Sequence, residues 1–344
     1  MTEILNIFDD DAFSMMSMSL PLEKTQYIPT MATTVGTFTR LSVPTENVAQ
    51  EEMDHATQVI QTSLRGEPRT ILGREKRDLR DFKSVRIGQT DSIRAAEVAK
   101  VRQFATNQLE SVQNLVARSV RKMNRNMLAT KEMHRLGLLQ GIWLDADGSV
   151  IYDYFSEFGV AQPAEIDWSG TAENTLTTNV RNLTRSMVAS LGGIAAPGME
   201  IVGLAGDAFY DHVTTHVDYK DQYKATNEAP SKLLDGSVYG ETIVGRGASG
   251  GIRLINYQGN TGLNANLAIT SDECKFFLRG VEGLFQEIYT TGESMSDVNN
   301  LGLPVYAKTI PDRDRDEYVD VDMDSYPVFI CSRPETLRRA SLTP

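Results

Sequence analysis

The residues of this chain that could do chemistry are, first, three aspartates in "DADGSVIYD", namely Asp145, Asp147 and Asp153. An EF-hand loop places calcium ligands at a similar spacing, but it also needs another Asp or Asn before its glycine and a glutamate at its end. This segment has neither. A hairpin turn uses Asp-Gly for its backbone angles. We therefore expect a hairpin turn here, with a calcium site as the alternative.

A second group of carboxylates lies in "PDRDRDEYVDVDMD", residues 311–324. If this segment is a strand, Asp320, Asp322 and Asp324 project from one face, because alternate side chains share a face. Such a face could hold a metal ion, but we expect it to face solvent or another subunit. A metal-dependent hydrolase that uses either group of aspartates is the remote alternative for the function.

The remaining candidate sites have weaker patterns. His212 and His216 are four residues apart, but Val213 stands where a zinc protease needs a glutamate. The glycine-rich "GRGASGG" at 245–251 lacks the Lys-Ser/Thr ending of a phosphate-binding loop. No Ser-His-Asp, Cys-His or paired-Glu arrangement is recognisable from spacing. The sequence therefore predicts a protein that is not an enzyme, with no catalytic residues, metal or cofactor.

The composition is ordinary for a globular protein, with 344 residues, 41% hydrophobic residues and a net charge of −12. The length fits two compact domains, or one domain with extensions. The acidic balance argues against a protein whose main task is to grip nucleic acid, because phosphate binding needs clustered Lys and Arg. Cys274 and Cys331 predict no disulfide framework. No apolar run is long enough for a transmembrane helix.

The strongest periodic pattern predicts one long helix over residues 91–136. Asp91 or Ser92 is the expected N-cap, and Gly137 is the expected stop. Apolar residues recur at spacings of three and four and form one stripe on which a sheet can pack. This stripe comprises Val98, Val101, Ala105, Leu109, Val112, Leu115, Val116, Val120, Met123 and Met127. The polar face is basic and includes Arg118, Arg121, Lys122, Arg125, Lys131 and Arg135.

A long charged hairpin is predicted before this helix, with strands over 55–64 and 69–87 and a turn at 65–68. It has too few apolar groups for a core of its own, so it must lie on something else. An alternating strand is expected at 37–43, and a strand–turn–strand unit over 141–160.

Farther along the chain, residues 163–190 are expected to be mainly helical. Short apolar segments and glycine-rich loops from about 195 to 310 predict a second, α+β domain. The last segment, with "YPVFIC", is expected to return as a strand to the first domain.

Several segments, taken in order, resemble the major capsid protein E family of tailed phages, the lambda-type capsid proteins. They are "FDDDAFSMMSMSLPLEKTQYIPT", "RGEPRTILGREKRDLRDFKSVRI", "DSIRAAEVAKVRQF", "RLGLLQGIWLDADGSVIYDYFSEFGV" and "SYPVFICSRPETLRRA". The resemblance implies an α+β fold of the Hong Kong 97 capsid type. Residues 1–50 would be the N-arm and 51–92 the extended E-loop hairpin. Residues 93–194 with 311–344 would form the peripheral domain around the long spine helix, and 195–310 the axial domain.

The function implied by this resemblance is that of a major capsid protein. Such a protein self-assembles as hexamers and pentamers into the icosahedral head shell around the double-stranded DNA of a tailed bacteriophage. The shell of a gene transfer agent or an encapsulin-like compartment is the alternative within this fold.

The resemblance and the uncovered apolar groups together predict three sets of assembly residues. The N-arm set is Phe8, Phe13, Met15, Met16 and Met18, which we expect to pack against a neighbouring subunit. The E-loop set is Arg65, Glu67, Arg69, Arg74, Lys76, Arg77, Asp78, Arg80 and Asp81. The basic face of the spine helix contributes Arg118, Arg121, Lys122 and Arg125, expected to pair with acidic strands such as 316–324 of the same or the next subunit.

The expected partners are other copies of this chain, a scaffolding protein, a portal and a decoration protein. The shell would enclose DNA without sequence-specific binding and without contact to a membrane. We expect it in the virion, assembled in the host cytoplasm. Since no scaffolding segment precedes the arm, we also expect no maturation cleavage of this chain.

Overall fold

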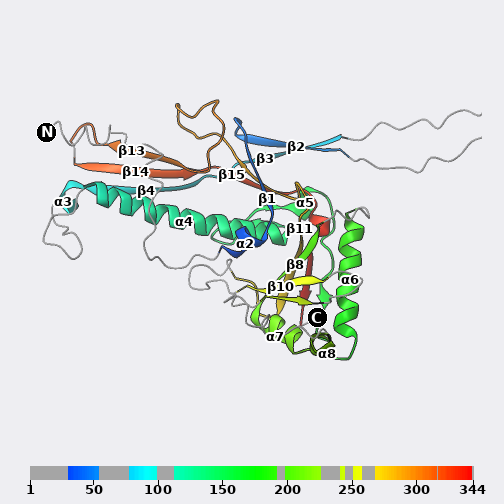
Figure 1. The fold of residues 1–344 in the computed structure, drawn as a ribbon. Coiled ribbons are helices and arrows are strands. Elements are labelled where there is room, and N and C mark those ends of the chain that lie inside the picture. The colour runs from blue at the N-terminus through cyan, green and yellow to red at the C-terminus, as the bar shows by residue number, and fades with distance from the viewer. Residues whose placement is uncertain are drawn as a thin grey trace, which may run out of the picture.

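The computed structural model describes residues 30–53, 77–98, 112–191, 198–225, 241–244, 251–257, 268–315 and 317–342. Two parts are visible in Figure 1. A long helix with strands along its upper side forms one part. A second sheet with helices at its side and lower end forms the other, beneath the end of the long helix.

The long helix is α4, Val112–Gln140, and one of its faces packs against a three-stranded antiparallel sheet. That sheet has the order β13 (Tyr306–Pro311), β14 (Tyr318–Ser325) and β4 (Ile87–Arg94). The second half of the predicted apolar stripe is confirmed, since Val116, Val120, Met123 and Met127 are buried against Ile93, Val321 and Met323 of the sheet. Of the first half, Val98 lies in another helix, and Val101, Ala105 and Leu109 lie outside the described residues.

The predicted start and end of this helix are wrong. Asp91 and Ser92 do not cap a helix but lie in β4, where they pair with Val321 and Asp320 of β14. The short α3, Ala95–Val98, follows β4, and residues 99–111 lie outside the described residues.

At the other end of α4, the chain continues through Gly137 to Gln140, and Gly141 then adopts a φ of 82°. Gly137 is needed inside the helix because a Cβ there would lie 2.6 Å from the carbonyl oxygen of Ile142 in β5. The glycine that predicted a stop instead allows the helix and the next strand to approach closely.

A second three-stranded sheet joins distant segments, in the order β1 (Phe38–Ser42), β12 (Phe285–Tyr289) and β15 (Pro327–Cys331). The predicted strand at 37–43 is therefore confirmed. The return of "YPVFIC" to the first part of the molecule is also confirmed, because β15 lies beside α4. The short helix α2, Met31–Val35, precedes β1.

The predicted charged hairpin is tested only in part, because the structure describes only its base. Strand β2 (Asn47–Met53) pairs antiparallel with β3 (Arg77–Lys83), and the predicted strand at 55–64 and turn at 65–68 lie outside the described residues. The return strand does not run on to residue 87, because the chain leaves β3 after Lys83 and enters β4 in another sheet.

The predicted strand–turn–strand unit over 141–160 is confirmed as β5 (Ile142–Leu144) and β6 (Val150–Asp153), followed by α5 (Tyr154–Glu157).

The second part is built on a six-stranded sheet of order β7-β16-β11-β8-β10-β9. Its strands are β7 (Ile166–Asp167), β8 (Glu200–Ala205), β9 (Glu241–Val244), β10 (Ile252–Asn256), β11 (Glu273–Arg279) and β16 (Arg338–Ser341). Helices α6 (Thr175–Ser190), α7 (Asp207–Thr215) and α8 (Val217–Ala225) lie around it (Figure 1).

The sheets divide the chain differently from the predicted boundaries. Strands β12 and β13 begin before residue 311 but lie in the sheets of the first part. Strand β16 follows residue 311 but pairs with β11 in the second part, reached through the short 3-10 helix η5 (Pro334–Thr336). Hydrogen bonds between strands far apart in sequence decide which sheet each strand joins. Local residue patterns therefore cannot predict it.

The close approach of α4 and β5 gives a prediction. We expect Gly137→Ala to lower the free energy of unfolding by about 1–3 kcal/mol, as overpacking does. At a solvent-exposed position inside a helix, the same change would raise the free energy of unfolding by up to about 1 kcal/mol. Urea unfolding of the unassembled chain measures the sign, with Ala129→Gly as the reference for helix propensity in α4. A gain in stability from Gly137→Ala would contradict the packing described here.

Candidate functional site

The charged residues near the end of α4 form a buried network. Lys131, Glu132 and Arg135, together with Glu287 of β12, are no more than 5% exposed. The expectation that Lys131 and Arg135 belong to the basic polar face of the helix is therefore wrong. This side of α4 is covered by α2 and by β1 and β12, so its charges meet partners from these elements.

Glu132 caps the short helix α2. One of its oxygens, Oε1, accepts a hydrogen bond of 2.6 Å from the Ala32 amide. The other, Oε2, accepts from the amide of Thr33 at 3.2 Å and from its hydroxyl at 2.5 Å. Thr30, at the N-cap position, makes no side-chain cap bond. A carboxylate from a distant helix therefore satisfies amides that a helix start leaves without partners.

Arg135 connects this cap to the central sheet. Its guanidinium donates to the Thr33 hydroxyl at 2.7 Å and to both oxygens of Glu287, at 2.8 and 3.0 Å. Glu287 also accepts from the hydroxyl of Tyr289 and lies 3.5 Å from the guanidinium of Arg40 on β1. One nitrogen, Nη2, contacts both oxygens, and hydrogen bonds between two charged groups are stronger than those between neutral groups.

Lys131 lies at the edge of the network. Its Nζ donates to the carbonyl oxygen of Pro304 at 2.7 Å and stands 4.9 Å from the centre of the Tyr289 ring. Burial lowers the pKa of this amine to about 8, and repulsion from Arg135 and Arg40 acts in the same direction.

The pKa values of the two buried carboxylates, Glu132 and Glu287, shift in opposite directions. Burial raises the pKa of Glu132 above its ordinary value, although the hydrogen bonds from Thr33 and Ala32 oppose the shift. Burial acts on Glu287 in the same sense, but Arg135 and the Tyr289 hydroxyl outweigh it and lower its pKa. Glu287 is thus held as the anion that Arg135 requires.

His134, next along α4, packs into an aromatic site. Its ring lies 5.6 Å from the centres of the Trp143 and Phe329 rings, edge to face with both. Neither ring nitrogen has a hydrogen-bond partner among the described residues. Burial, with smaller effects of Arg135 and Lys131 in the same direction, lowers the pKa of His134 to about 4, although Asp145 opposes the shift. The imidazole is therefore a neutral core side chain at neutral pH.

The base of the β2–β3 hairpin is fixed to its own chain through one face. Phe82 is buried beside the rings of Tyr152, Tyr154 and Phe158. Arg80, on the same face of β3, lies 4.5 Å from the centre of the Phe158 ring and donates to the Glu157 carbonyl oxygen at 3.2 Å.

The predicted assembly residues are placed in part. Asp81 is exposed on the outer face of β3, whereas Arg80 has the contacts just described. Arg77 and Asp78 pair along the backbone with Met53 and Glu52. The remaining members of the E-loop set and the whole N-arm set lie outside the described residues.

On the spine helix α4, Arg118 and Lys122 are exposed, and Arg121 and Arg125 are half-buried. We expected these basic side chains to pair with acidic strands such as 316–324, but Asp320, Asp322 and Asp324 do not form such pairs within one chain. These carboxylates alternate with the buried Val321 and Met323 and so project from the opposite side of the sheet to α4.

The aspartates considered for metal binding have structural roles. Asp147 accepts a 2.8 Å bond from the amide of Ser149 in the predicted hairpin turn, and Asp153 caps α5 through the amide of Phe155. Asp320 pairs with the hydroxyl of Ser92. Within the part of the chain that the structure describes, no group of three or more His, Cys, Asp or Glu side chains could hold a metal ion.

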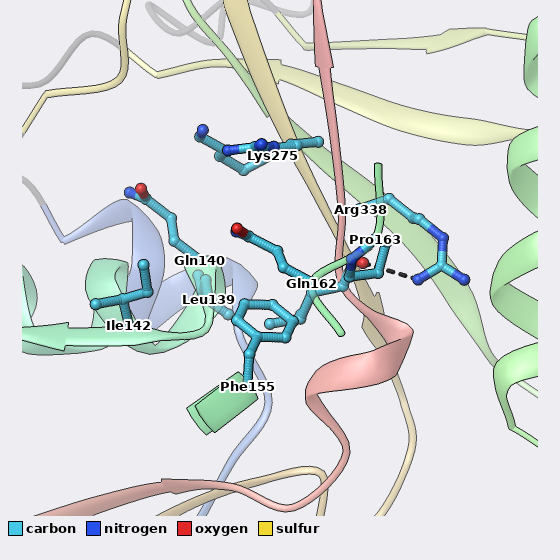
Figure 2. Close-up of a pocket in the computed structure, with 10 residues that line it drawn as sticks. Leu139, Gln140, Ile142, Phe155, Gln162, Pro163, Lys275 and Arg338 are labelled. Carbon is cyan, nitrogen blue, oxygen red and sulfur yellow. Dashed lines mark hydrogen bonds between the residues drawn. The ribbon is translucent and has the colours of Figure 1, made fainter. Parts of the chain in front are cut away.

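A small pocket lies where the end of α4 meets β11 and β16 (Figure 2). Gln140, Gln162 and Lys275 stand around it, and Phe155 lies at its side. The Arg338 guanidinium points away and donates to Ser190 Oγ at 2.6 Å on α6. The described lining residues include no carboxylate, histidine, serine or cysteine, so the pocket offers no hydroxyl or thiol nucleophile and no carboxylate or imidazole base. Its one amine, on Lys275, is paired with Glu273.

Sequence reasoning missed two features. The buried network could have been suspected from charged residues that continue the helix into a stretch of buried leucines, "KEMHRLGLL". The second feature is the segment between β12 and β13, which exposes Met295, Val298, Leu301 and Leu303. Its only hint was a set of apolar residues scattered through a stretch rich in Gly, Ser and Asn.

Solved structures with the same fold are phage capsids. The mature capsid of bacteriophage PhiM1 has a TM-score of 0.54 and 10% identity, covering 94% of this chain and 90% of its own. The capsid of Myoviridae phage XM1 has a TM-score of 0.54 and 10% identity, covering 94% and 95%. These matches show the fold, an α+β fold of the Hong Kong 97 capsid type.

The chain belongs to the phage major capsid protein E family, whose model matches residues 14–342. The major capsid protein of Salmonella phage Felix O1 (isolate Felix O1-VT1) is 22% identical over 273 residues, which are 72% of this chain and 74% of the relative. Within the described residues, no helix is long and apolar enough to cross a membrane.

The buried pair of Arg135 and Glu287 gives a prediction. We expect Arg135→Met to lower the free energy of unfolding by about 3–5 kcal/mol, because it leaves a buried carboxylate without its main partner. The double variant Arg135→Met/Glu287→Met should regain most of this loss. Arg86→Met, which removes an exposed ion pair with Asp324, should cost less than about 1 kcal/mol. Equal losses for Arg135→Met and Arg86→Met in urea unfolding would contradict the network.

His134 gives a prediction for pH dependence. Its pKa is about 4 in the folded chain, below the usual 6.5, so its contribution to stability is complete above about pH 6.5 and falls as the pH approaches 4. The loss from His134 between pH 7 and 4 is about 3 kcal/mol. We expect His134→Leu to flatten the pH profile of unfolding by that amount relative to the unchanged chain. Parallel profiles for the two proteins would show that His134 is not buried in the neutral form.

Proposed function

We propose that this chain self-assembles as hexamers and pentamers into the icosahedral head shell that encloses the double-stranded DNA of a tailed phage. The observation that carries the proposal is the family match over residues 14–342. Surfaces that a single copy leaves uncovered support it.

The first such surface is the outer face of the β2–β3 hairpin. Phe82 holds the inner face on its own chain, but Leu79 on the outer face is 67% exposed. Asp81 and Lys83 beside it are exposed as well. An isolated hairpin has little stability of its own, and a neighbouring copy would cover what this one leaves in water. This is the E-loop contact of the proposed shell.

The second surface is the segment 291–304. Internal bonds order its backbone: the Thr291 hydroxyl donates to the Asp297 carbonyl at 2.6 Å, and the Gly302 amide donates to Val43 at 3.2 Å. Met295 is nonetheless 94% exposed and Leu301 63%. An ordered loop that holds apolar groups in water is typical of an interaction surface.

We assign the domains of the shell subunit according to the sheets. The peripheral domain comprises α4 with the β13–β14–β4 and β1–β12–β15 sheets. The axial domain comprises the six-stranded sheet with α6, α7 and α8, including the terminal strand β16. Residues 1–50 and 51–92 keep their proposed roles as N-arm and E-loop except for β1 and β4, which lie in the sheets of the peripheral domain.

The proposed partners follow from this role. They are other copies of the chain, a scaffolding protein and a portal during assembly, and a decoration protein on the finished shell. Assembly in the host cytoplasm belongs to the same proposal.

The test is the size of the purified protein, by light scattering and negative-stain microscopy. We expect shells or capsomer rings from the full chain and their loss when residues 1–24 are removed. Leu79→Asp should also reduce assembly, whereas Val217→Asp, an equally polar change at an exposed position on α8, should not. A monodisperse 38.1 kDa monomer under all conditions, including crowding, would count against the proposal.

A further inference from the structure

The first half of α4 carries a group of cations with no carboxylate among them. Between Val112 and Thr130 the charged residues are Arg118, Arg121, Lys122 and Arg125, and no Asp or Glu occurs. Their spacing of three, four and seven residues places them on one face of the helix. At about 1.5 Å per residue this basic face is some 10 Å long. It is an exception in a chain with a net charge of −12.

The packing of α4 fixes the direction of this basic face. The apolar stripe of the helix is buried against Val321 and Met323 of β14, so the exposed Arg118 and Lys122 project away from the sheet. Asp320, Asp322 and Asp324 project from the other side of the same sheet. The helix and its sheet therefore form a two-layer unit with one basic and one acidic face.

We propose that the basic face of α4 is the surface where the shell wall contacts the phosphate backbone of the enclosed nucleic acid. The inference rests on the proposed function, because only a closed shell turns one face of every copy toward a polyanion. Arg and Lys side chains only donate hydrogen bonds, which fits phosphate oxygens. Contacts to phosphates carry no base information, so the binding is independent of sequence.

The distribution of charge favours nucleic acid, and not a second copy of this chain, as the partner that binds the basic face of α4. Asp320, Asp322 and Asp324 lie on the other side of the two-layer unit, and Asp91, which does face α4, already accepts a hydrogen bond from Ser119 of this helix. In a single-layer shell these two faces look in opposite directions, so the β14 aspartates of one copy are turned away from the basic face of the next. A few cations per copy give a weak contact, which many copies multiply, and the net negative charge of the chain limits adhesion elsewhere.

The experiment compares two variants with the same loss of charge. Arg118→Gln/Lys122→Gln removes the exposed pair of the basic face, and Arg313→Gln/Arg315→Gln removes an exposed pair in the β13–β14 turn. Fluorescence anisotropy with a short DNA duplex follows binding of the full chain over a range of salt concentrations. We expect the first variant to reduce the slope of log K against log salt by about 2, since each lost phosphate contact removes about 0.9. The second should keep the original slope, and equal slopes for both would overturn the inference.

A second measurement uses the particles. In DNA-filled shells, Lys122 should react more slowly with an amine-labelling reagent than in emptied shells, whereas Lys220, exposed on α8, should react equally in both. Equal labelling of Lys122 in the two states would overturn the inference. So would a loss of shells in Arg118→Gln/Lys122→Gln alone, because the face would then bind another copy. Absence of shells from every variant and from the unchanged chain would instead contradict the proposed function.

Discussion

The buried charges at the end of α4 hold the first part of this subunit together. Glu132 fixes the backbone of α2, Arg135 binds Glu287 on β12, and Arg40 of β1 reaches the same carboxylate. Elements separated by more than a hundred residues thus depend on one another, because a buried charge without its partner costs several kcal/mol. The start of the described chain, the long helix and the central sheet therefore behave as one rigid unit.

A rigid unit of this kind can present elements that do not bury themselves. The β2–β3 hairpin rests on it through Phe82, and the segment 291–304 is bonded to it through the Gly302 amide. Preorganised surfaces lose little conformational entropy when they bind. This matches a shell protein, in which each contact between copies can be modest while the sum of many closes a particle.

The same architecture separates charge. Because alternate residues of β14 point to opposite faces, its apolar side chains take the side of α4 and its aspartates take the other. The helix presents its cations on the far side from these aspartates. An acidic protein thereby keeps one basic strip, at a place defined by packing.

The sequence by itself determined the existence of the long helix, its apolar stripe, the 145–148 turn and the family resemblance. These follow from local periodicity, from Asp-Gly turn chemistry and from the order of segments along the chain. Only the tertiary structure decided that Asp91 lies in a strand, that Gly137 continues the helix, that β16 joins the second sheet, and that Lys131 and Arg135 are buried. The physical reason is that pairing and burial depend on partners distant in sequence. A charged residue has the same local pattern whether it faces water or a buried carboxylate.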